Sequence, residues 1–224
     1  IGRHTRPNRS DREAVSMRSF GALARKDSLR AAFKQKRLAL SPEERASIDA
    51  VIAERVCELP EFESAQLIAS YLSFDAEVET RGIIERAWQE GKTVALPRCV
   101  PASRRMRWYT IDSLDGLERH AFGMQEPAED PAREVDLAVH KGALAIVPAL
   151  AVDMQGFRLG YGGGYYDVFL AELSGVSVGL CREVQVVEDL AALGARERYD
   201  IPVDLVITET RFLRAHRGDE PRTV

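Results

Sequence analysis

Apolar residues along the chain follow two patterns, a helical spacing of three and four residues and continuous runs typical of buried strands. Two amphipathic helices are predicted first, over residues 26–40 and 42–59. The first places five residues on one face: Leu29, Ala32, Phe33, Lys36 and Leu40. The second has a clear start, because Ser41 is a candidate N-cap, Pro42 fits the first helical position and Glu44 completes a capping box.

From residue 67 onward, strand-like runs alternate with helix-like segments. Strands are predicted over residues 67–74, 93–99, 106–111, 143–152, 176–181 and 203–208. Helices are predicted over residues 80–91, 165–173 and 188–198. Most of these strands are continuous apolar runs, as parallel strands covered on both faces are, whereas residues 106–111 alternate with polar residues and indicate a sheet edge or an antiparallel insertion. The pattern predicts an α/β fold, a three-layer α/β/α sandwich with a mostly parallel sheet.

Composition narrows the classes of protein that this chain can represent. With 224 residues, 45% of them hydrophobic, the chain can bury a substantial core. Its formal net charge of -4 argues against nucleic-acid binding through bulk charge. The longest apolar run, residues 143–152, is shorter than the ~18 residues that span a bilayer and is interrupted by Pro148, so no membrane segment is expected.

The three cysteines are far apart and form no C-x-x-C pair. They therefore indicate neither a disulfide framework nor a zinc site, and they favour a reducing, cytoplasmic location. Residues 1–25 are rich in Arg and Ser but contain Asp11 and Glu13 and lack an apolar stretch, so we expect a disordered extension rather than a targeting peptide. No linker divides the rest of the chain, and residues 26–224 are predicted to form a single domain.

The segment RLGYGGGYYD, residues 158–167, carries the most distinctive chemistry in the sequence. Its four glycines lie between a predicted core strand and a predicted helix, where open α/β sheets bind ligands. Backbone N–H groups and a helix N-terminus at such a place form a cradle for an anion. The loop matches neither the G-x-x-x-x-G-K-[ST] nor the G-x-G-x-x-G pattern.

Two charged residues flank these glycines. Arg158 offers a guanidinium of the kind that binds phosphate oxygens, and Asp167 adds a carboxylate in the first helical turn. An acid there could simply interact favourably with the helix dipole. Beside a polyphosphate, however, a carboxylate is repelled unless Mg²⁺ lies between them. The combination favours a magnesium–nucleotide site, with a purely structural glycine turn as the alternative.

The longer segment VPALAVDMQGFRLGYGGGYYD, residues 147–167, resembles the signature of the 5-formyltetrahydrofolate cyclo-ligase (methenyltetrahydrofolate synthetase) family. The resemblance covers nearly all of residues 26–210 and includes four further segments: KDSLR (26–30), YLSFDAEVET (71–80), GMQEP (123–127) and YDIPVDLVIT (199–208). It implies a fold related to the sugar-phosphate isomerases and CoA-transferases. It also implies a ligase that uses ATP and Mg²⁺ to convert 5-formyltetrahydrofolate to 5,10-methenyltetrahydrofolate through a phosphorylated, imidate-like formyl group, releasing ADP and phosphate.

The resemblance assigns a role to each site residue. Contacts to ATP would come from Lys26, Arg30, Arg158, Leu159, Gly160, Tyr161, Gly162, Gly163, Gly164, Tyr165 and Tyr166. The reduced folate would contact Leu72, Glu77, Tyr161, Gly162, Gly163, Gly164 and Tyr165. Magnesium would be held by Asp167 and Asp200, and the catalytic residues would be Arg158 and Tyr165.

Several of these residues have simpler explanations. Lys26 and Arg30, four residues apart on a helix, also fit a solvated basic face. Asp200 fits the start of a turn, and Tyr165 and Tyr166 fit core aromatics beneath a helix. Val168 stands where many family members have an arginine, and two residues are candidates to supply the missing charge: Arg98 and Arg107.

A non-catalytic folate- or nucleotide-binding protein on the same fold is the alternative function. The presence together of Lys26, Arg30, Glu77, Asp167 and Asp200 argues against it. A sugar-phosphate isomerase would need an acid/base pair that the sequence does not offer. We expect only small-molecule partners, reduced folate and ATP, with no nucleic acid and no membrane, and a monomer or a weak homo-oligomer.

Overall fold

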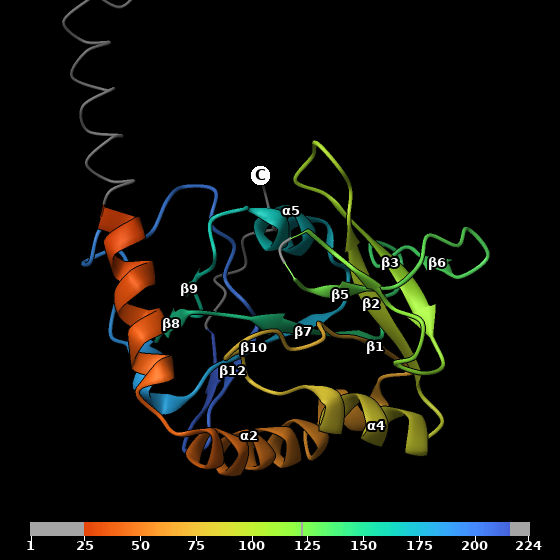
Figure 1. Ribbon diagram of the computed structural model, residues 1–224, viewed down its shortest axis with the longest axis horizontal. Coiled ribbons are helices and arrows are strands. Elements are labelled where there is room, and N and C mark those ends of the chain that lie inside the picture. Colours follow the sequence, from red (N-terminus) through yellow and green to blue (C-terminus); the bar gives the residue numbers. More distant parts are fainter. Residues whose placement is uncertain (1–24, 122, 216–224) are drawn as a thin grey trace, which may run out of the picture.

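A mostly parallel sheet forms the centre of the computed structural model, which describes residues 25–121 and 123–215. Within these residues the sheet has eight strands in the order β13-β12-β10-β7-β1-β2-β3-β6 (Figure 1). The inner strands run parallel: β12 (Leu205–Ile207), β10 (Val176–Leu180), β7 (Ala143–Pro148), β1 (Leu67–Ala69) and β2 (Thr93–Cys99). The edges are antiparallel: β13 (Phe212–Arg214), β3 (Met106–Ile111) and β6 (Glu134–Val135). Both the mostly parallel sheet and the antiparallel residues 106–111 are as predicted.

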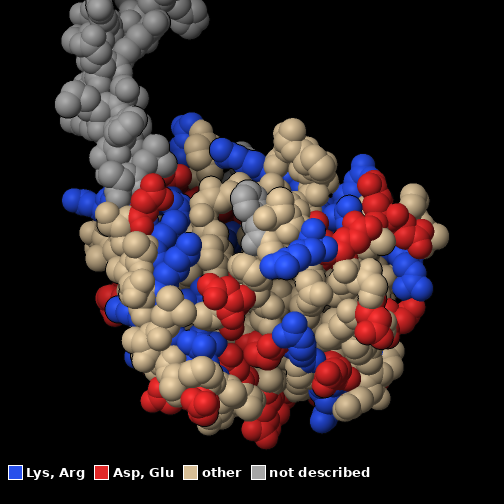
Figure 2. Space-filling view, viewed as in Figure 1, with Lys and Arg blue, Asp and Glu red and all other residues tan. Residues whose placement is uncertain are grey.

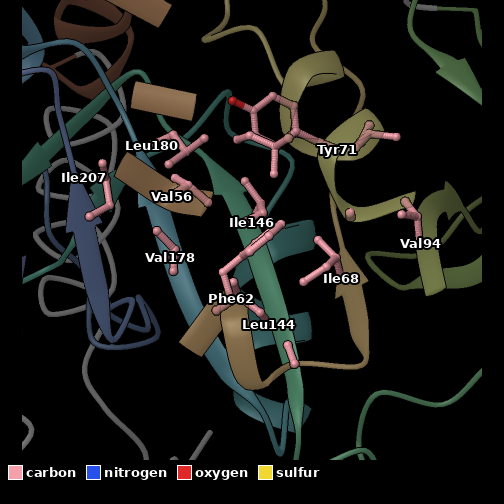
Figure 3. Packing of buried hydrophobic residues seen from close by; sticks show 14 of the residues in the cluster. Val56, Phe62, Ile68, Tyr71, Val94, Leu144, Ile146, Val178, Leu180 and Ile207 are labelled. Atoms are coloured by element: carbon pink, nitrogen blue, oxygen red, sulfur yellow. The ribbon is translucent and has the colours of Figure 1, made fainter. Parts of the chain in front are cut away.

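Helices cover both faces of the sheet. One face carries α2 (Pro42–Cys57), α3 (Pro60–Ser64) and α4 (Arg81–Gln89), and the opposite face carries α5 (Tyr165–Glu172) (Figure 1). Phe62 and Val56 pack against Ile68 and Ile146 on the first face (Figure 3). On the second face, Phe169 of α5 packs against Trp108, with ring centroids 4.7 Å apart. Since successive strand residues point to opposite faces, the continuous apolar runs supply both cores, and the predicted three-layer arrangement is confirmed.

The predicted helix starts and ends agree well with the structure. Ser41 Oγ accepts a hydrogen bond from the Glu44 N–H at 3.1 Å, and Glu44 Oε2 accepts one from the Ser41 N–H at 2.7 Å. This capping box begins α2, which ends at Cys57, two residues before the predicted end. Gly91, in the left-handed region at φ +74°, follows α4 as the sequence predicts.

The predicted strand over residues 67–74 is wrong beyond Ala69, where β1 ends. Side chains replace the strand ladder in the segment that follows: Tyr71 Oη donates to the Val78 carbonyl at 2.9 Å, and Thr80 Oγ1 donates to the Tyr71 carbonyl at 2.7 Å. Tyr71 and Leu72 are buried although they lie in a loop, so their apolar character imitates a strand. The result is a structured loop, residues 70–80, at the carboxyl end of β1.

The single strand predicted over residues 143–152 is in fact two strands. β7 ends at Pro148, which has no N–H to continue the ladder, and the chain then enters β8 (Ala151–Asp153). β8 belongs to a separate sheet with β9 (Arg158–Leu159) and β11 (Val186–Val187). The Gln185 side chain, at the end of η1 (Glu183–Gln185), donates to the Leu150 carbonyl at 2.7 Å and stabilises the change of direction. This switch places the glycine loop beyond the carboxyl end of β7.

Two further predictions need correction or lie partly beyond the described residues. Residues 188–198 form turns rather than a helix, because the buried Asp153 carboxylate accepts the Leu190 N–H at 3.1 Å and fixes the chain in a non-helical course. The short hairpin of β4 (Glu118–Arg119) and β5 (Gln125–Glu126) was not predicted, since two-residue strands leave no periodic signal. Of the predicted extension, only Arg25 is described, and it is helical; the single domain over 26–224 stays a prediction.

No helix among the described residues is long and apolar enough to cross a membrane. On the face that Figure 2 shows, the described basic and acidic side chains are interspersed. Any anion that binds there must therefore be held by a local arrangement of groups rather than by a broad charged surface.

Candidate functional site

The N-terminal helix, described over residues 25–38, turns a row of cations inward. Lys26, Arg30 and Arg37 follow one another at spacings of four and seven residues, which places them on one face together with Phe33. The Lys26 and Arg30 side chains are 8% and 17% exposed, so the alternative of a solvated basic face is wrong. The predicted inward face also needs correction, because Ala32 and Lys36 are exposed.

Each of these cations contacts a segment more than 120 residues away in the sequence. Arg30 Nε donates to the Gly160 carbonyl at 3.0 Å, and Arg37 Nη1 donates to Tyr161 Oη at 2.7 Å. Lys26 Nζ lies 3.2 Å from Glu197 Oε2 and 3.5 Å from Asp200 Oδ2. The helix therefore closes over the glycine loop, and its cationic face forms one wall of the candidate site.

The glycines of the loop are required by backbone geometry and by close approach. Gly162 and Gly164 adopt φ values of +102° and +70°, in the left-handed region. A Cβ on Gly162 would lie 3.1 Å from the Arg30 guanidinium, and one on Gly163 would lie 2.7 Å from the Tyr165 ring. The backbone N–H groups of residues 162–164 donate to no acceptor among the described residues. The loop thus presents free donors at the N-terminus of α5, as an anion cradle does.

Arg158 lies beneath this loop and is buried, with 7% of its surface exposed. Its Nη2 is 2.8 Å from Asp167 Oδ1, and its guanidinium lies 5.5 Å from the centre of the Tyr166 ring. Burial lowers the pKa of Arg158, and the charge of Asp167 opposes that change. Its Nε finds no acceptor among the described residues. A buried guanidinium with an unused donor is a site prepared for a further acceptor.

Asp167 and Asp200 lie close together beside the same loop. Their side chains are 26% and 16% exposed, and Asp167 Oδ1 also accepts the Ile201 N–H at 3.4 Å. Burial raises the pKa of Asp167, Arg158 lowers it, and the neighbouring charge of Asp200 raises it further. No group of three or more His, Cys, Asp or Glu within the described part of the chain could hold a metal ion. Two carboxylates fit a Mg²⁺ ion that is shared with phosphate oxygens rather than enclosed by protein.

Glu77, from the loop after β1, approaches the glycine loop from another side. Its Oε2 accepts the Phe74 N–H at 3.0 Å, and its carboxyl group shares a hydrogen bond with Tyr161. Burial raises the pKa of Glu77, and the hydrogen bonds from Phe74 and Tyr161 and the charge of Arg37 oppose this. Burial and the charge of Glu77 raise the pKa of Tyr161 to about 12.

A cavity of about 320 Å³ adjoins the loop after β1. It is lined by Leu72, Phe74, Arg119 and Gly123, among others. It lies at the carboxyl end of β1, next to Glu77 in the chain. The structure thus places Leu72 in this cavity, Glu77 against Tyr161 of the glycine loop, and Lys26 against Asp200.

The two tyrosines after the glycines have different surroundings. Tyr166 contacts Phe169 in an edge-to-face arrangement at 6.1 Å as well as Arg158, which is the packing of a core aromatic residue. Tyr165 packs beneath Gly163, at the first position of α5. Burial raises the pKa of Tyr166, with a further rise from the charge of Glu77.

The cations expected near Val168 are engaged elsewhere. Arg98 Nη1 lies 2.7 Å from Glu118 Oε2, and Arg107 Nη1 lies 2.9 Å from Glu129 Oε1. Two other arginines, Arg104 and Arg105 from the turn between β2 and β3, lie beside α5 and its N-cap instead. Sequence reasoning missed both.

Sequence reasoning also missed Arg37 and the buried pair of Arg182 and Asp49. Arg37 could have been found, because it continues the row of Lys26 and Arg30 at helical spacing. The pair could not, since its members are 133 residues apart and neither carries a local signal.

Comparisons with known proteins match most of the chain, including the segments that form this site. Residues 22–209 match the model of the 5-formyltetrahydrofolate cyclo-ligase family. The 5-formyltetrahydrofolate cyclo-ligase of Escherichia coli (strain K12) is 33% identical over 182 residues, covering 80% of this chain and 97% of the bacterial protein. The Mus musculus 5-formyltetrahydrofolate cyclo-ligase is 30% identical, covering 82% of this chain and 93% of its own. The NMR structure of Aquifex aeolicus 5,10-methenyltetrahydrofolate synthetase superposes with a TM-score of 0.72 at 31% identity, covering 87% of this chain and 95% of that one.

Proposed function

This chain belongs to the 5-formyltetrahydrofolate cyclo-ligase family of enzymes, and we propose that it converts 5-formyltetrahydrofolate to 5,10-methenyltetrahydrofolate with consumption of ATP. The main support for ATP dependence is that cationic and anionic side chains lie together at the glycine loop. The cationic face of the N-terminal helix and the free N–H groups of the glycine loop lie beside two carboxylates, Asp167 and Asp200. Cations and carboxylates around one anion cradle suit a nucleotide that binds together with magnesium.

The phosphate groups of ATP would be held by three cations and by backbone donors. The cations are Lys26, Arg30 and Arg158, and the donors belong to residues 159–166. Asp167 and Asp200 would hold Mg²⁺, which neutralises phosphate charge when it is bound. The unused Nε of Arg158 and the free N–H groups of residues 162–164 support this assignment, because both lack acceptors within the described residues.

The reduced folate would lie on the opposite side of the glycine loop. The Glu77 carboxylate suits the amino-pyrimidine edge of the pterin, which offers paired donors. Leu72 would contact the same ligand, and residues 161–165 would separate it from ATP. The hydrogen bond between Tyr161 and Glu77 supports this assignment, since it puts the proposed folate contact beside the glycine loop.

The reaction needs positioning and charge neutralisation rather than a nucleophilic side chain. The formyl oxygen is a poor leaving group, so it would first attack the γ-phosphorus of ATP, and ADP would depart. N10 of the same folate would then attack the formyl carbon, form the new C–N bond, lose its proton and expel phosphate. Arg158 would stabilise the negative charge of the transferred phosphoryl group, and Tyr165, at the start of α5, would position it.

A spectrophotometric assay tests the proposal. Purified protein with 5-formyltetrahydrofolate, ATP and Mg²⁺ should generate the absorbance band of 5,10-methenyltetrahydrofolate, and omission of ATP or chelation of Mg²⁺ should abolish it. Absence of any ATP-dependent product would overturn the proposal. Calorimetric binding of the folate without ATP hydrolysis would instead support the non-catalytic alternative. We propose in addition that the protein binds only small-molecule partners, lies in the cytoplasm, and is a monomer or a weak homo-oligomer.

A further inference from the structure

The turn between β2 and β3, residues 100–105, reaches the helix that follows the glycine loop (Figure 1). Hydrogen bonds within the turn fix its shape: the Val100 N–H donates to the Arg105 carbonyl at 3.0 Å, and the Ser103 N–H donates to the Val100 carbonyl at 3.2 Å. These backbone hydrogen bonds position Arg104. Arg105 makes a separate, solvent-exposed ion pair, with Nη2 3.1 Å from Glu172 Oε1 at the C-terminal end of α5.

Arg104 lies against Gly164, the residue that precedes the first turn of α5. A Cβ on Gly164, the N-cap of α5, would be 3.5 Å from Arg104 Cδ and 3.8 Å from its Nη1. The guanidinium therefore lies where a side chain on Gly164 would contact it, beside the loop whose N–H groups are free. Unlike Arg105, Arg104 contacts the N-terminal end of the helix rather than its C-terminal end.

This location is electrostatically unfavourable for an unpaired cation. The N-terminus of a helix carries partial positive charge and repels a guanidinium. Arg158 and Arg30 approach the same loop, but their charges are balanced, because Arg158 pairs with Asp167 and Arg30 with Asp27.

Arg104, which is exposed, has no such counter-charge among the described residues. Arg98, Arg105 and Arg107, from the same pair of strands and their turn, each contact a carboxylate. Within the described residues, Arg104 alone among these four makes no ion pair. The buried Nε of Arg158 independently indicates a missing acceptor at the same loop. An anion bound at the α5 N-terminus would accept hydrogen bonds from Arg104 and from the free N–H groups of the glycine loop.

We infer that Arg104 is a further phosphate-binding residue of this chain, contacting a phosphate group of ATP at the N-terminus of α5. The inference rests on the proposed function, since it requires ATP to occupy the glycine loop. It adds a fourth cation to the proposed phosphate contacts Lys26, Arg30 and Arg158. This cation comes from the turn between β2 and β3.

The test compares two neighbouring substitutions, Arg104→Ala and Arg105→Ala. Each removes one positive charge from the same turn, but only the first removes the cation beside Gly164. Loss of a charge-assisted hydrogen bond should raise KM for ATP about tenfold in Arg104→Ala, leaving KM for 5-formyltetrahydrofolate nearly unchanged. Arg104→Lys should recover part of the loss, and Arg105→Ala should behave like the wild type. Equal melting temperatures of the variants would establish that folding is intact.

Binding of magnesium tripolyphosphate, measured by calorimetry, supplies a readout that does not depend on turnover. Arg104→Ala should weaken it by a similar factor, whereas binding of adenosine should be unaffected. A wild-type KM for ATP in Arg104→Ala, or an equal increase in Arg105→Ala, would overturn the inference and leave the proposed function standing. A wild-type protein that makes no ATP-dependent product would instead overturn the proposed function, and tripolyphosphate binding would then still test Arg104.

Discussion

Asp167 combines a proposed role in magnesium binding with a structural role, and the sequence alone does not distinguish the two. It is a proposed magnesium ligand, and it is also the carboxylate that pairs with the buried Arg158, at 2.8 Å. The pair is half enclosed, because Arg158 is 4% exposed at its side chain and Asp167 is 26% exposed. A substitution at this residue should therefore affect both turnover and stability.

Asp167→Asn tests both roles. We expect turnover at saturating Mg²⁺ to fall about 100-fold, since a proposed ligand of the ion that neutralises the phosphate charge is lost. We also expect the free energy of unfolding to fall by about 1–3 kcal/mol, because Arg158 keeps a hydrogen-bond acceptor but loses its counter-charge. A magnesium titration of activity and urea unfolding measure the two effects. Asp115→Asn, an exposed position, is the control; unchanged magnesium dependence in Asp167→Asn would refute the metal assignment.

Glu77 should give the folate site a distinctive pH dependence. Burial raises its pKa, so the folded protein favours the neutral carboxyl group, and ionisation of Glu77 costs stability as the pH rises from its unfolded to its folded pKa. Folate binding would require the carboxylate. Affinity should therefore fall as the pH decreases through the raised pKa, at a higher pH than an ordinary glutamate would allow.

The corresponding substitution is Glu77→Gln. KM for 5-formyltetrahydrofolate should rise about tenfold or more at neutral pH and lose the component of its pH dependence that comes from Glu77. Steady-state kinetics between mildly acidic and neutral pH would measure this. Glu85→Gln, on the exposed side of α4, is the matched control and should keep the wild-type profile. An identical pH profile in Glu77→Gln would show that another group is responsible.

At the scale of elements, one buried ion pair joins α2 to the loop that carries Glu77. Arg182 Nε and Nη2 contact the two carboxylate oxygens of Asp49 at 2.8 and 2.7 Å. Arg182 also donates to the carbonyls of Ala76 and Glu77, at 2.9 and 3.2 Å, and Asp49 accepts the Glu79 N–H at 3.0 Å. Helix, loop and the chain after β10 are thereby held in one arrangement.

Asp49→Ala should lower the free energy of unfolding by about 3–5 kcal/mol, because Arg182 would be left buried without its partner. Asp49→Leu combined with Arg182→Met should restore much of that stability but not the affinity for 5-formyltetrahydrofolate, since the loop loses its hydrogen bonds. Urea unfolding and KM values measure the two effects. Asp112→Ala, which breaks an exposed pair with Arg133, should cost no more than about 1 kcal/mol. Wild-type folate affinity in the double variant would contradict a positioning role.

At the scale of the whole molecule, the N-terminal helix is attached mainly through polar contacts. Phe33 is the fully buried apolar residue of its described part, and the partly buried Leu29 packs against the same apolar cluster. The polar inward contacts are those of Lys26, Arg30 and Arg37. Ion pairs and hydrogen bonds of this kind are weakened by salt more than apolar packing is. Bound phosphate groups would bridge the helix to the glycine loop.

Hydrogen exchange should report this coupling. Amides of residues 25–38 should exchange faster in high salt and more slowly with Mg-ATP, whereas amides of α4 should respond little to either. Mass spectrometry of the exchanged protein, with adenosine as the ligand control, measures both effects. Protection by Mg-ATP that spares residues 25–38 would contradict the placement of Lys26 and Arg30 beside the phosphates.

Much of the fold could be predicted because its signals are short in range. The capping box of Ser41 and Glu44, the glycine after α4 and the apolar runs of β2, β7 and β10 each depend on residues within a few positions of one another. Errors arose where tertiary contacts replaced local ones, as in residues 70–80, where side chains bond to loop carbonyls, and in residues 188–198, where Asp153 fixes a turn.

The sequence alone determined most of the helices and core strands, the glycine loop and the family, because caps, periodicity and a contiguous signature need no knowledge of distant residues. Only the tertiary structure decided which face of the N-terminal helix points inward, since a cation can be buried only where distant groups such as Glu197 and Gly160 compensate its charge. The same reason applies to Arg182 with Asp49. Burial and pairing of charge depend on three-dimensional neighbours, and those neighbours lie far apart along the chain.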